Sequence, residues 1–424
     1  MEKCGVKQRR AKDKCDFSPD CLSDYFASCS RPALLRQPLI EGRRFDECFV
    51  FRIVCAVDLR RALMSVKSNA VGLDDISLRY LKVVYPLIEE QVLHLVNFVF
   101  LTGVFPSQWK VSRVVPVPKK TVTLTVSDFR PISVLPVLSK VFETLAKRQM
   151  LDWVARFELL SPFQSGYRTG HSTTTAVLKI VDDVGGALDR GQVSALVLLD
   201  FSKAFDCLDH RLLCQKLSRQ FGFGPSSVGL VRSYLANRRQ VVFVDGVASR
   251  EVFVHCGVPQ GSILGPLFSL FVNDLGEVVE CSGYHLYADD LQLYHSSPAG
   301  DVARLSTELN RDLSSVVAWS RRNGLLLNVG KTQALFVSRP RSLDEPPALL
   351  LDGSPISFSS SLNDLGFLLD SRLSWDRFSE LVCGRVSAAL RRLRVYSRLH
   401  VQTKVRLFKS LILPFFNLRA PNYA

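Results

Sequence analysis

Two short acidic stretches, each flanked by apolar residues, constrain this chain more than any other feature of its sequence. Residues 194–201 (SALVLLDF) are an apolar run with Asp200 near its end, which is typical of a buried strand. Residues 285–295 (HLYADDLQLYH) place the pair Asp289 and Asp290 between apolar residues, which is typical of a hairpin with a charged tip. If the two stretches fold together, three carboxylates lie side by side.

Three neighbouring carboxylates repel one another, and without a counter-charge they would retain protons. Divalent cations relieve this repulsion, and all-oxygen ligands suit Mg²⁺. Two Mg²⁺ ions would supply what nucleotidyl transfer needs, namely a more acidic primer 3′-hydroxyl and a stabilised pyrophosphate leaving group. We therefore predict that Asp200, Asp289 and Asp290 are catalytic metal ligands. The alternative for either stretch alone is a helix cap at Asp200, or a solvated turn at Asp289 and Asp290.

Further segments occur in a fixed order around these stretches. Upstream are residues 105–109 (FPSQW), 115–120 (VPVPKK), 128–133 (DFRPIS) and 163–176 (FQSGYRTGHSTTTA). Between the stretches are residues 256–262 (CGVPQGS), and downstream are 323–331 (NGLLLNVGK) and 365–375 (LGFLLDSRLSW). Together with LDFSKAFD and LYADD, this ordered set resembles the reverse transcriptase domain of non-LTR retrotransposons, in particular the jockey-like lineage. The resemblance covers nearly the whole chain.

This resemblance implies an α/β (α+β) fold in the right-hand arrangement of polymerases. We expect a leader over residues 1–55, fingers over 56–195, a palm with an antiparallel sheet over 196–375 and a truncated helical thumb over 376–424. The implied activity is RNA-templated DNA polymerase, with two Mg²⁺ ions as cofactors. Its partners would be an RNA template, a DNA primer and dNTPs, and the sequence does not indicate an oligomeric state.

The resemblance also assigns nucleotide-binding roles to residues outside the acidic stretches. Lys119 and Arg130 would reach the triphosphate as a point charge and as a fork on phosphate oxygens, although either alone could be plain surface charge. Gln260 supplies an amide for hydrogen bonding, and Gly261 lets the backbone approach a base or sugar. A PQGS sequence alone would more often be an ordinary turn.

Three more assignments concern the sugar, the pyrophosphate and the template. Phe205, five residues after Asp200, would lie beneath the sugar and leave no room for a 2′-hydroxyl, or it could simply be core. Lys331 would meet the pyrophosphate as a catalytic residue. The hydroxyl-rich and glycine-rich residues 163–176 would suit contacts along a template backbone.

The charge of the chain favours a polyanionic partner. The net charge is +14 with a pI near 9.4, although a membrane-surface or ribosomal protein would also be basic. Residues 384–409 contain no acidic residue, and apolar residues recur there at roughly helical spacing. We expect one helical segment whose basic face binds duplex phosphates, with a solvated helix face as the alternative. The proposed nucleic-acid-binding residues are Arg385, Arg391, Arg392, Arg394 and Arg398.

Signals for targeting, metal knuckles and disulfides are absent or weak. No apolar run reaches the ~18 residues that a transmembrane helix needs. The basic first 15 residues lack the apolar segment of a secretory signal. The eleven cysteines include no CxxC pair, so they predict neither a zinc site nor a disulfide framework. We expect a protein of the cytoplasm and nucleus without a membrane partner.

Helix signals and departures from the family pattern complete the expectations. Asp74 or Asp75 could cap one helix, and a second should end at Gly103. No endonuclease domain would fit before residue 45, and the chain stops where family thumbs continue. Residues 267–274 (LFSLFVND) are one residue shorter than in relatives, so a helix starting near Ser262 and ending over residues 273–275 should pack poorly. The alternative function is therefore a catalytically silent, nucleic-acid-binding remnant.

Overall fold

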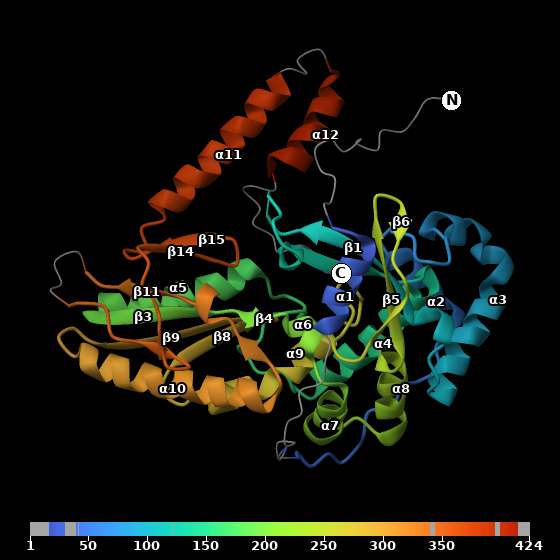
Figure 1. The fold of residues 1–424 in the computed structure, drawn as a ribbon, viewed down its shortest axis with the longest axis horizontal. Helices are drawn as coiled ribbons and strands as arrows, with labels where there is room; N and C mark the ends of the chain where they lie inside the picture. Colours follow the sequence, from blue (N-terminus) through green and yellow to red (C-terminus); the bar gives the residue numbers. More distant parts are fainter. Residues whose placement is uncertain are drawn as a thin grey trace. The chain divides into compact units, whose positions relative to one another are not determined.

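The chain forms a mixed α/β structure that contains antiparallel and mixed sheets (Figure 1). The computed structural model describes residues 17–29, 40, 42–120, 122–339, 344–394 and 399–413. Contacts divide the chain into two compact units, residues 1–159 with 203–267 and residues 160–202 with 268–424. The expected α/β class is confirmed. The two units are interleaved along the sequence, whereas the fingers, palm and thumb ranges were expected to be consecutive.

The first unit is built on a mixed sheet with the strand order β2-β1-β5-β6, in which β7 also pairs with β5. Strand β1 is antiparallel to β2 and parallel to β5. Helix α1 packs on this sheet through Leu22 and Phe26, which join a buried cluster with Val114 and Val242. The strands are β1 (Val111–Pro118), β2 (Phe129–Val134), β5 (Arg238–Val244), β6 (Val247–Ala248) and β7 (Val252–Val254).

Helices surround this sheet, and their ends follow local sequence signals. Helix α3 begins after Ser77, whose Oγ accepts a hydrogen bond from the N–H of Tyr80, and it ends at Gly103 with φ of 67°. The end at Gly103 was predicted, but the cap at Asp74 or Asp75 was wrong. Asp74 instead accepts from the N–H of Ile76 in a turn before the helix. The helices are α1 (Pro19–Ser28), α2 (Ala56–Ser65), α3 (Leu78–Thr102), α4 (Val137–Arg156), α6 (Ala204–Cys207), α7 (His210–Phe221), α8 (Pro225–Leu235) and the 3₁₀ turns η1 (Ser107–Trp109) and η2 (Val126–Asp128).

Helix α3 is unusually apolar on its exposed side. Among the described residues it is the one helix whose length and composition would allow it to cross a membrane, and most of it is not buried. This corrects the expectation that no segment would reach that length. Its exposed apolar side chains include Val83, Leu87 and Leu101, which lie on the surface of the first unit.

The second unit is built on an antiparallel sheet with the strand order β11-β3-β9-β8. Helix α5 covers one face and α10 the other (Figure 1). Because both faces are covered, β3 is buried along almost its whole length, which explains its continuous apolar sequence. The elements are β3 (Gln192–Leu199), β8 (Gly283–Tyr287), β9 (Asp290–Pro298), β11 (Gln333–Val337), α5 (Thr173–Asp189) and α10 (Val302–Arg322).

Smaller two-stranded sheets complete the described part of the second unit. β4 pairs with β10, while β12 with β13 and β14 with β15 form short antiparallel ladders. The bounds are β4 (Phe201–Ser202), β10 (Leu326–Leu327), η4 (Val329–Lys331), β12 (Leu350–Leu351), β13 (Ser354–Pro355), β14 (Ser361–Asp364), β15 (Phe367–Asp370), α11 (Asp376–Arg394) and α12 (Val401–Leu411).

The segment with the suspected missing residue is well packed. A short helix, α9 (Pro266–Phe271), is followed by the 3₁₀ turn η3 (Asn273–Val278), so the expected helix start near Ser262 was wrong. Pro266 cannot donate an intrahelical hydrogen bond and suits a first helical position. The tighter winding of η3 changes the direction of the side chains, and Phe271, Val272 and Leu275 are all fully buried. The expected turning of apolar residues away from the core does not occur.

Candidate active site

Asp200 directly follows β3 and Asp290 begins β9, and these two strands are neighbours in the sheet of the second unit. Strands β3 and β9 pair with Leu199 opposite Leu291, so one step further along the register Asp200 faces Asp290. Asp289 lies in the two-residue turn between β8 and β9. The predicted strand and the predicted hairpin are both present, and the backbone brings the three aspartates to one end of the sheet.

Lys331 lies at this same end of the sheet. Its Nζ donates to Oδ2 of Asp200 at 2.8 Å, and the N–H of Asn328 donates to the carbonyl oxygen of Asp200 at 2.8 Å. Both side chains of the ion pair are accessible to solvent, with 65% of the Lys331 side chain and 32% of the Asp200 side chain exposed. The carboxylate of Asp200 can therefore be reached by a cation from solvent.

The chemistry of these donors fits Mg²⁺, because hard divalent cations prefer carboxylate oxygens. Asp200 already pairs with a cationic group, the ammonium of Lys331. However, in the described part of the chain no group of three or more His, Cys, Asp or Glu side chains is arranged to hold a metal ion. The backbone register thus suits a shared metal site, while the carboxylates of Asp200, Asp289 and Asp290 would have to turn toward one another to form it.

Lys119 and Arg130 lie at one end of the β1–β2 hairpin in the first unit. Lys119 follows the last residue of β1, and Arg130 is the second residue of β2. The ammonium of Lys119 donates to the carbonyl oxygen of Ser127 at 2.7 Å. Lys120 forms an ion pair of 3.1 Å with Asp128 and is the largest cause that lowers the pKa of Asp128 to about 2. The hairpin end therefore concentrates positive charge, as binding of a triphosphate would require.

Phe205 is held by a second, tightly packed turn of the first unit. Its carbonyl oxygen accepts from the N–H of Val258 at 2.9 Å, and the N–H of Gly257 donates to the carbonyl oxygen of Leu208 at 2.8 Å. A Cβ atom at Gly257 would lie 2.5 Å from the carbonyl oxygen of Phe205, and φ of Gly257 is 84°. Only glycine permits this approach. Phe205 itself is half-buried.

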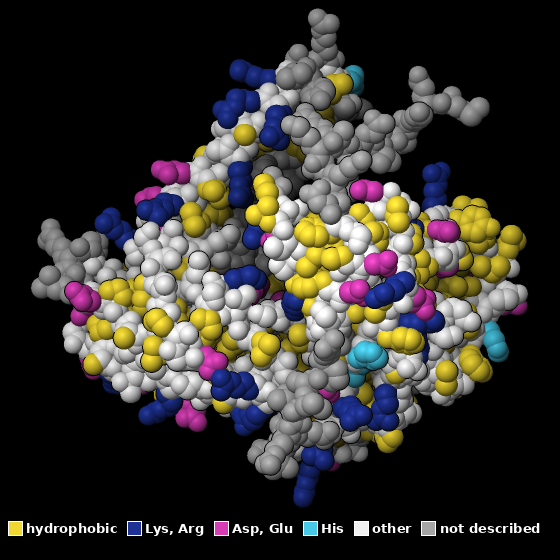
Figure 2. Space-filling model, in the orientation of Figure 1, with side chains coloured by type: hydrophobic (Ala, Val, Ile, Leu, Met, Phe, Trp, Pro, Cys, Tyr) yellow, Lys and Arg dark blue, Asp and Glu magenta, His cyan; other side chains and the backbone are white. Residues whose placement is uncertain are grey.

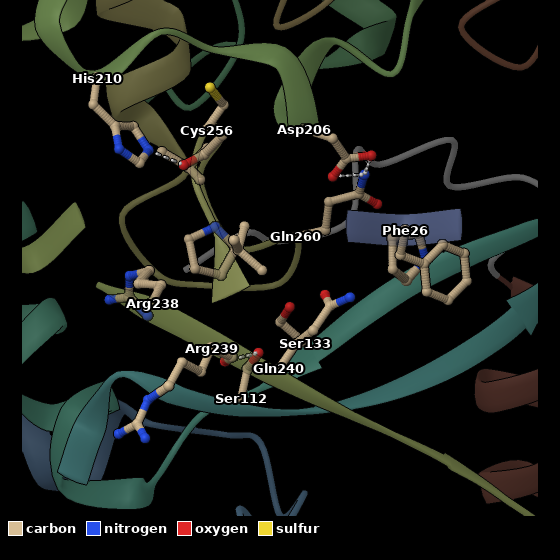
Figure 3. Close-up of a pocket in the computed structure, with 15 residues that line it drawn as sticks. Phe26, Ser112, Ser133, Asp206, His210, Arg238, Arg239, Gln240, Cys256 and Gln260 are labelled. Atoms are coloured by element: carbon tan, nitrogen blue, oxygen red, sulfur yellow. Dashed lines mark hydrogen bonds between the residues drawn. The ribbon is translucent and has the colours of Figure 1, made fainter. Parts of the chain in front are cut away.

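Gln260 continues this turn and contacts a residue that the sequence prediction missed. Its Nε2 donates to both carboxylate oxygens of Asp206, each at 3.1 Å (Figure 3). The backbone carbonyl oxygen of Gln260 accepts a hydrogen bond from the backbone N–H of Ser133 on β2 at 2.8 Å. Gly261 has φ of 96°, and a Cβ atom there would lie 3.3 Å from the carbonyl oxygen of Ser133. The second aspartate of LDFSKAFD was the available signal for Asp206.

Desolvation dominates the environment of Asp206. Burial raises the pKa of Asp206 to about 6, whereas Gln260 and Lys203 act in the opposite direction. Asp206 lines a small cavity of about 40 Å³ together with His210 and Arg238 (Figure 3). The Nε2 of His210 donates to the carbonyl oxygen of Gly257 at 2.7 Å. A cavity of this size has room for a few water molecules and is too small for a nucleotide.

The predicted basic face lies on α11 in the second unit. The expected single helical segment over residues 384–409 was wrong, because α11 ends at Arg394 and a separate helix, α12, begins after His400. Dark blue basic side chains project from these helices in Figure 2. Arg398 lies outside the described residues. The four predicted residues that the structure describes are all exposed, namely Arg385, Arg391, Arg392 and Arg394.

Comparison with known proteins agrees with this arrangement of residues. Residues 117–369 match the family described as reverse transcriptase (RNA-dependent DNA polymerase). The match includes every predicted catalytic and nucleotide-binding residue. It ends before α11, so the basic helix lies outside the matched range.

The chain is also similar to curated transposon proteins, several of them from insects. The chain is 31% identical over 313 residues to a probable RNA-directed DNA polymerase from transposon BS of Drosophila melanogaster, which covers 70% of this chain and 33% of that protein. It is 28% identical over 339 residues to the RNA-directed DNA polymerase from mobile element jockey of the same species, covering 76% and 36%. For the transposon X-element protein of this species, the identity is 29% over 322 residues, covering 73% and 35%. The chain thus spans about a third of the length of these relatives.

Proposed function

The chain belongs to the reverse transcriptase (RNA-dependent DNA polymerase) family, and we propose that it copies RNA into DNA as the polymerase part of a non-LTR retrotransposon protein. The observation that carries this proposal is the strand register that sets Asp200 beside Asp290. The reaction would join a dNTP to the 3′-hydroxyl of a primer. In this proposal residues 56–195, 196–375 and 376–424 act as fingers, palm and thumb.

Asp200, Asp289 and Asp290 would hold two Mg²⁺ ions. When bound, these ions would make the primer 3′-hydroxyl more acidic and stabilise the charge on the pyrophosphate. The protein contributes the rigid sheet end that carries the ligands. The exposed ammonium of Lys331 would donate a hydrogen bond or a proton to the oxygen of the departing pyrophosphate. The flexible side chain can reach it once the ammonium breaks its ion pair with Asp200.

The first unit would bind the incoming nucleotide. Lys119 and Arg130 would contact phosphate oxygens from the end of the β1–β2 hairpin. Phe205 would exclude a 2′-hydroxyl by occupying the space beneath the sugar. Gln260 would contact the nucleotide or template, and its amide is oriented by Asp206. The backbone hydrogen bond between Val258 and Phe205 would hold the Phe205 ring and the Gln260 amide at a fixed distance from each other.

The basic face of α11 would hold the template–primer duplex. Its exposed arginines would neutralise phosphates without reading sequence, so binding would depend strongly on salt concentration. The partners would be an RNA template, a DNA primer and dNTPs. Such a protein would work in the cytoplasm and nucleus, where RNA and chromosomal DNA are found.

The proposal is tested by primer extension with the purified chain, poly(rA)–oligo(dT), dTTP and Mg²⁺. We expect extension by the wild type and none by Asp289→Asn, with duplex binding retained in both, because metal ligation and phosphate contacts are separate interactions. Asp245→Asn is the matched control, because Asp245 is exposed in the β5–β6 turn at φ of 50°, a conformation that asparagine accepts. Equal extension by wild type and Asp289→Asn would remove Asp289 from the reaction.

A catalytically silent, nucleic-acid-binding remnant is the second candidate. One observation favours it: among the described residues, no three His, Cys, Asp or Glu side chains are close enough together to hold a metal ion. Under this alternative the wild type would bind duplex with a steep salt dependence yet extend no primer at any Mg²⁺ concentration. Extension that requires Asp200, Asp289 and Asp290 would exclude it.

A further inference from the structure

The turn that carries Asp289 has a strained backbone. Tyr287 and Asp290 pair across the β8–β9 hairpin, which leaves Ala288 and Asp289 as its two central residues. Ala288 has φ of 57°, which lies in the left-handed region, whereas Asp289 does not have a positive φ. Two-residue hairpins with a positive φ at the first central position normally have glycine there. Something outside the hairpin must therefore stabilise this conformation of Ala288.

Gln164 contacts the strained residue. This side chain is fully buried, and its Oε1 accepts from the N–H of Gly166 at 2.8 Å and from the N–H of Ala288 at 3.3 Å. Both partners are donors, so the carbonyl end of the amide must face them. Its Nε2 is buried and has no hydrogen-bond partner in the described part of the chain. The acceptor is thus the part of Gln164 that the turn uses.

Gly166 presses against the same turn. A Cβ atom at Gly166 would lie 2.4 Å from the backbone nitrogen of Ala288 and 2.9 Å from its Cα. Contacts this short do not occur between real atoms, so any larger residue would push the turn away. Gly166 and Gln164 therefore contact the backbone of Ala288 from the same segment, one by hydrogen bonding and one by close packing.

The segment that holds these two residues is itself fixed to β8. The N–H of Ser165 donates to the carbonyl oxygen of Leu286 at 2.8 Å, and the N–H of Leu286 donates to the carbonyl oxygen of Phe163 at 2.9 Å. The Oγ of Ser165 is 2.8 Å from Nε2 of His285. Gln164 thus forms an isolated parallel β-bridge with Leu286, beside the hairpin. This part of residues 163–176, the stretch predicted to contact the template, contacts the hairpin.

We propose that Gln164 is a positioning residue that fixes the Ala288–Asp289 turn and thereby the directions of the Asp289 and Asp290 carboxylates. The inference rests on the proposed function, because it gives these carboxylates the catalytic role. Displacement of catalytic groups by about 1 Å can reduce a rate by about 100-fold. The residues proposed to bind the nucleotide belong to the first unit, so the loss should fall on kcat and not on KM for dNTP.

Three variants and one control test this role. Gln164→Met keeps the length of the side chain and removes the acceptor, while Gln164→Glu retains an acceptor oxygen, and burial would favour its neutral form. Gly166→Ala keeps the Gln164 side chain but crowds the turn and Oε1 of Gln164, because a Cβ atom there would lie 2.4 Å from the backbone nitrogen of Ala288 and 2.9 Å from Oε1. Gly185→Ala is the matched control, because Gly185 lies on α5 in the same unit and a Cβ there meets nothing within 4 Å.

We expect Gln164→Met and Gly166→Ala to lower kcat of primer extension by about 10- to 100-fold, with KM for dTTP within about twofold of the wild type. Gln164→Glu should recover much of the lost kcat, and Gly185→Ala should match the wild type. Hydrogen–deuterium exchange of a peptide covering residues 286–291 should be faster in Gln164→Met and Gly166→Ala only. This readout needs no activity.

The outcomes separate the inference from the proposed function. If the wild type extends primers and Gln164→Met keeps its kcat within about twofold, the positioning role is wrong while the proposed function stands. If the wild type extends no primer, the proposed function fails, and the exchange experiment alone decides whether Gln164 holds the turn. Unchanged exchange in Gln164→Met would overturn the inference in either case.

Discussion

Lys331 and Asp200 form an ion pair of 2.8 Å between η4 and the residue that follows β3. The pair joins a residue proposed to meet the pyrophosphate with one proposed to bind metal. An ammonium group and Mg²⁺ cannot share the same carboxylate oxygen at full strength, since both are cations. Lys331 and the metal should therefore compete for Asp200.

The variant Lys331→Met should lower both the Mg²⁺ requirement and the maximal rate of primer extension. The Mg²⁺ concentration that gives half-maximal primer extension should fall, because Asp200 loses its competing cation. The maximal rate should fall by about 100-fold if Lys331 assists the leaving group. Lys179→Met is the control, since Lys179 also pairs with an aspartate, Asp183, but lies on α5. A maximal rate equal to that of the wild type would restrict Lys331 to a structural ion pair.

Phe205→Val should weaken the discrimination between deoxynucleotides and ribonucleotides. The smaller side chain opens space at the 2′ position, so the ratio of UTP to dTTP incorporation should rise by about tenfold. The measurement is kcat/KM for each nucleotide on the same template. Phe253→Val, a change at an exposed phenylalanine on β7 in the same unit, should leave the ratio unchanged. If Phe205→Val is active with an unchanged ratio, Phe205 is core packing only.

Asp206 should make the stability of the protein depend on pH. Its pKa is raised from 3.8 to about 6, chiefly by burial, so the folded protein holds this proton more tightly than the unfolded chain. The resulting stabilisation is complete below about pH 4 and is lost as the pH rises through about 6. A shift of about two pKa units corresponds to about 2–3 kcal/mol of stability between the two ends of this pH range.

Asp206→Asn removes this titration. The difference in Tm between Asp206→Asn and the wild type should therefore shift in favour of the variant from pH 4.5 to pH 7.5. Thermal unfolding of both proteins at the two pH values measures this difference, and Asp245→Asn should show no such shift. A difference that stays constant with pH would mean that Asp206 does not titrate in this range.

The local parts of the site could be predicted from the sequence, because single elements encode them. The apolar run before Asp200 predicted β3, and apolar residues on both sides of Asp289 and Asp290 predicted the β8–β9 hairpin. Gly103 ended α3 as expected, since only a residue that accepts a positive φ can close a helix in this way. Spacing and turn chemistry were sufficient in these places.

Contacts between distant segments could not be predicted in this way. Lys331 and Asp200 are 131 residues apart, and Gln164 and Ala288 are 124 residues apart. No periodicity or turn signal links such pairs, because their proximity depends on how the strands are ordered in the sheet. The interleaving of the two units has the same origin, and so does the partnership of Gln260 with Asp206 across 54 residues.

Two arginines on α11 should control the salt dependence of duplex binding. Replacing Arg391 and Arg394 with alanine should flatten the slope of log K against log salt by up to about two units, one for each lost phosphate contact. The control replaces Arg321 and Arg322 with alanine. Both arginines are exposed on α10 in the same unit, and their replacement removes the same charge. Equal slopes for all three proteins would mean that α11 is a solvated face.

Insertion of a leucine after Leu267 should lower the Tm. The family resemblance predicted a missing residue here. However, Leu267, Phe268 and Leu270 are already fully buried, as are Phe271 and Leu275. An added residue would rotate the following helical residues by about 100°. It would also force extra volume into a filled core, at a cost of about 1–3 kcal/mol. Insertion of a glycine after Gly300, whose surroundings are open, is the control and should change Tm much less. A rise in Tm on leucine insertion would instead mean that a residue is missing here and that the tighter 3₁₀ winding of η3 compensates for it at a cost in stability.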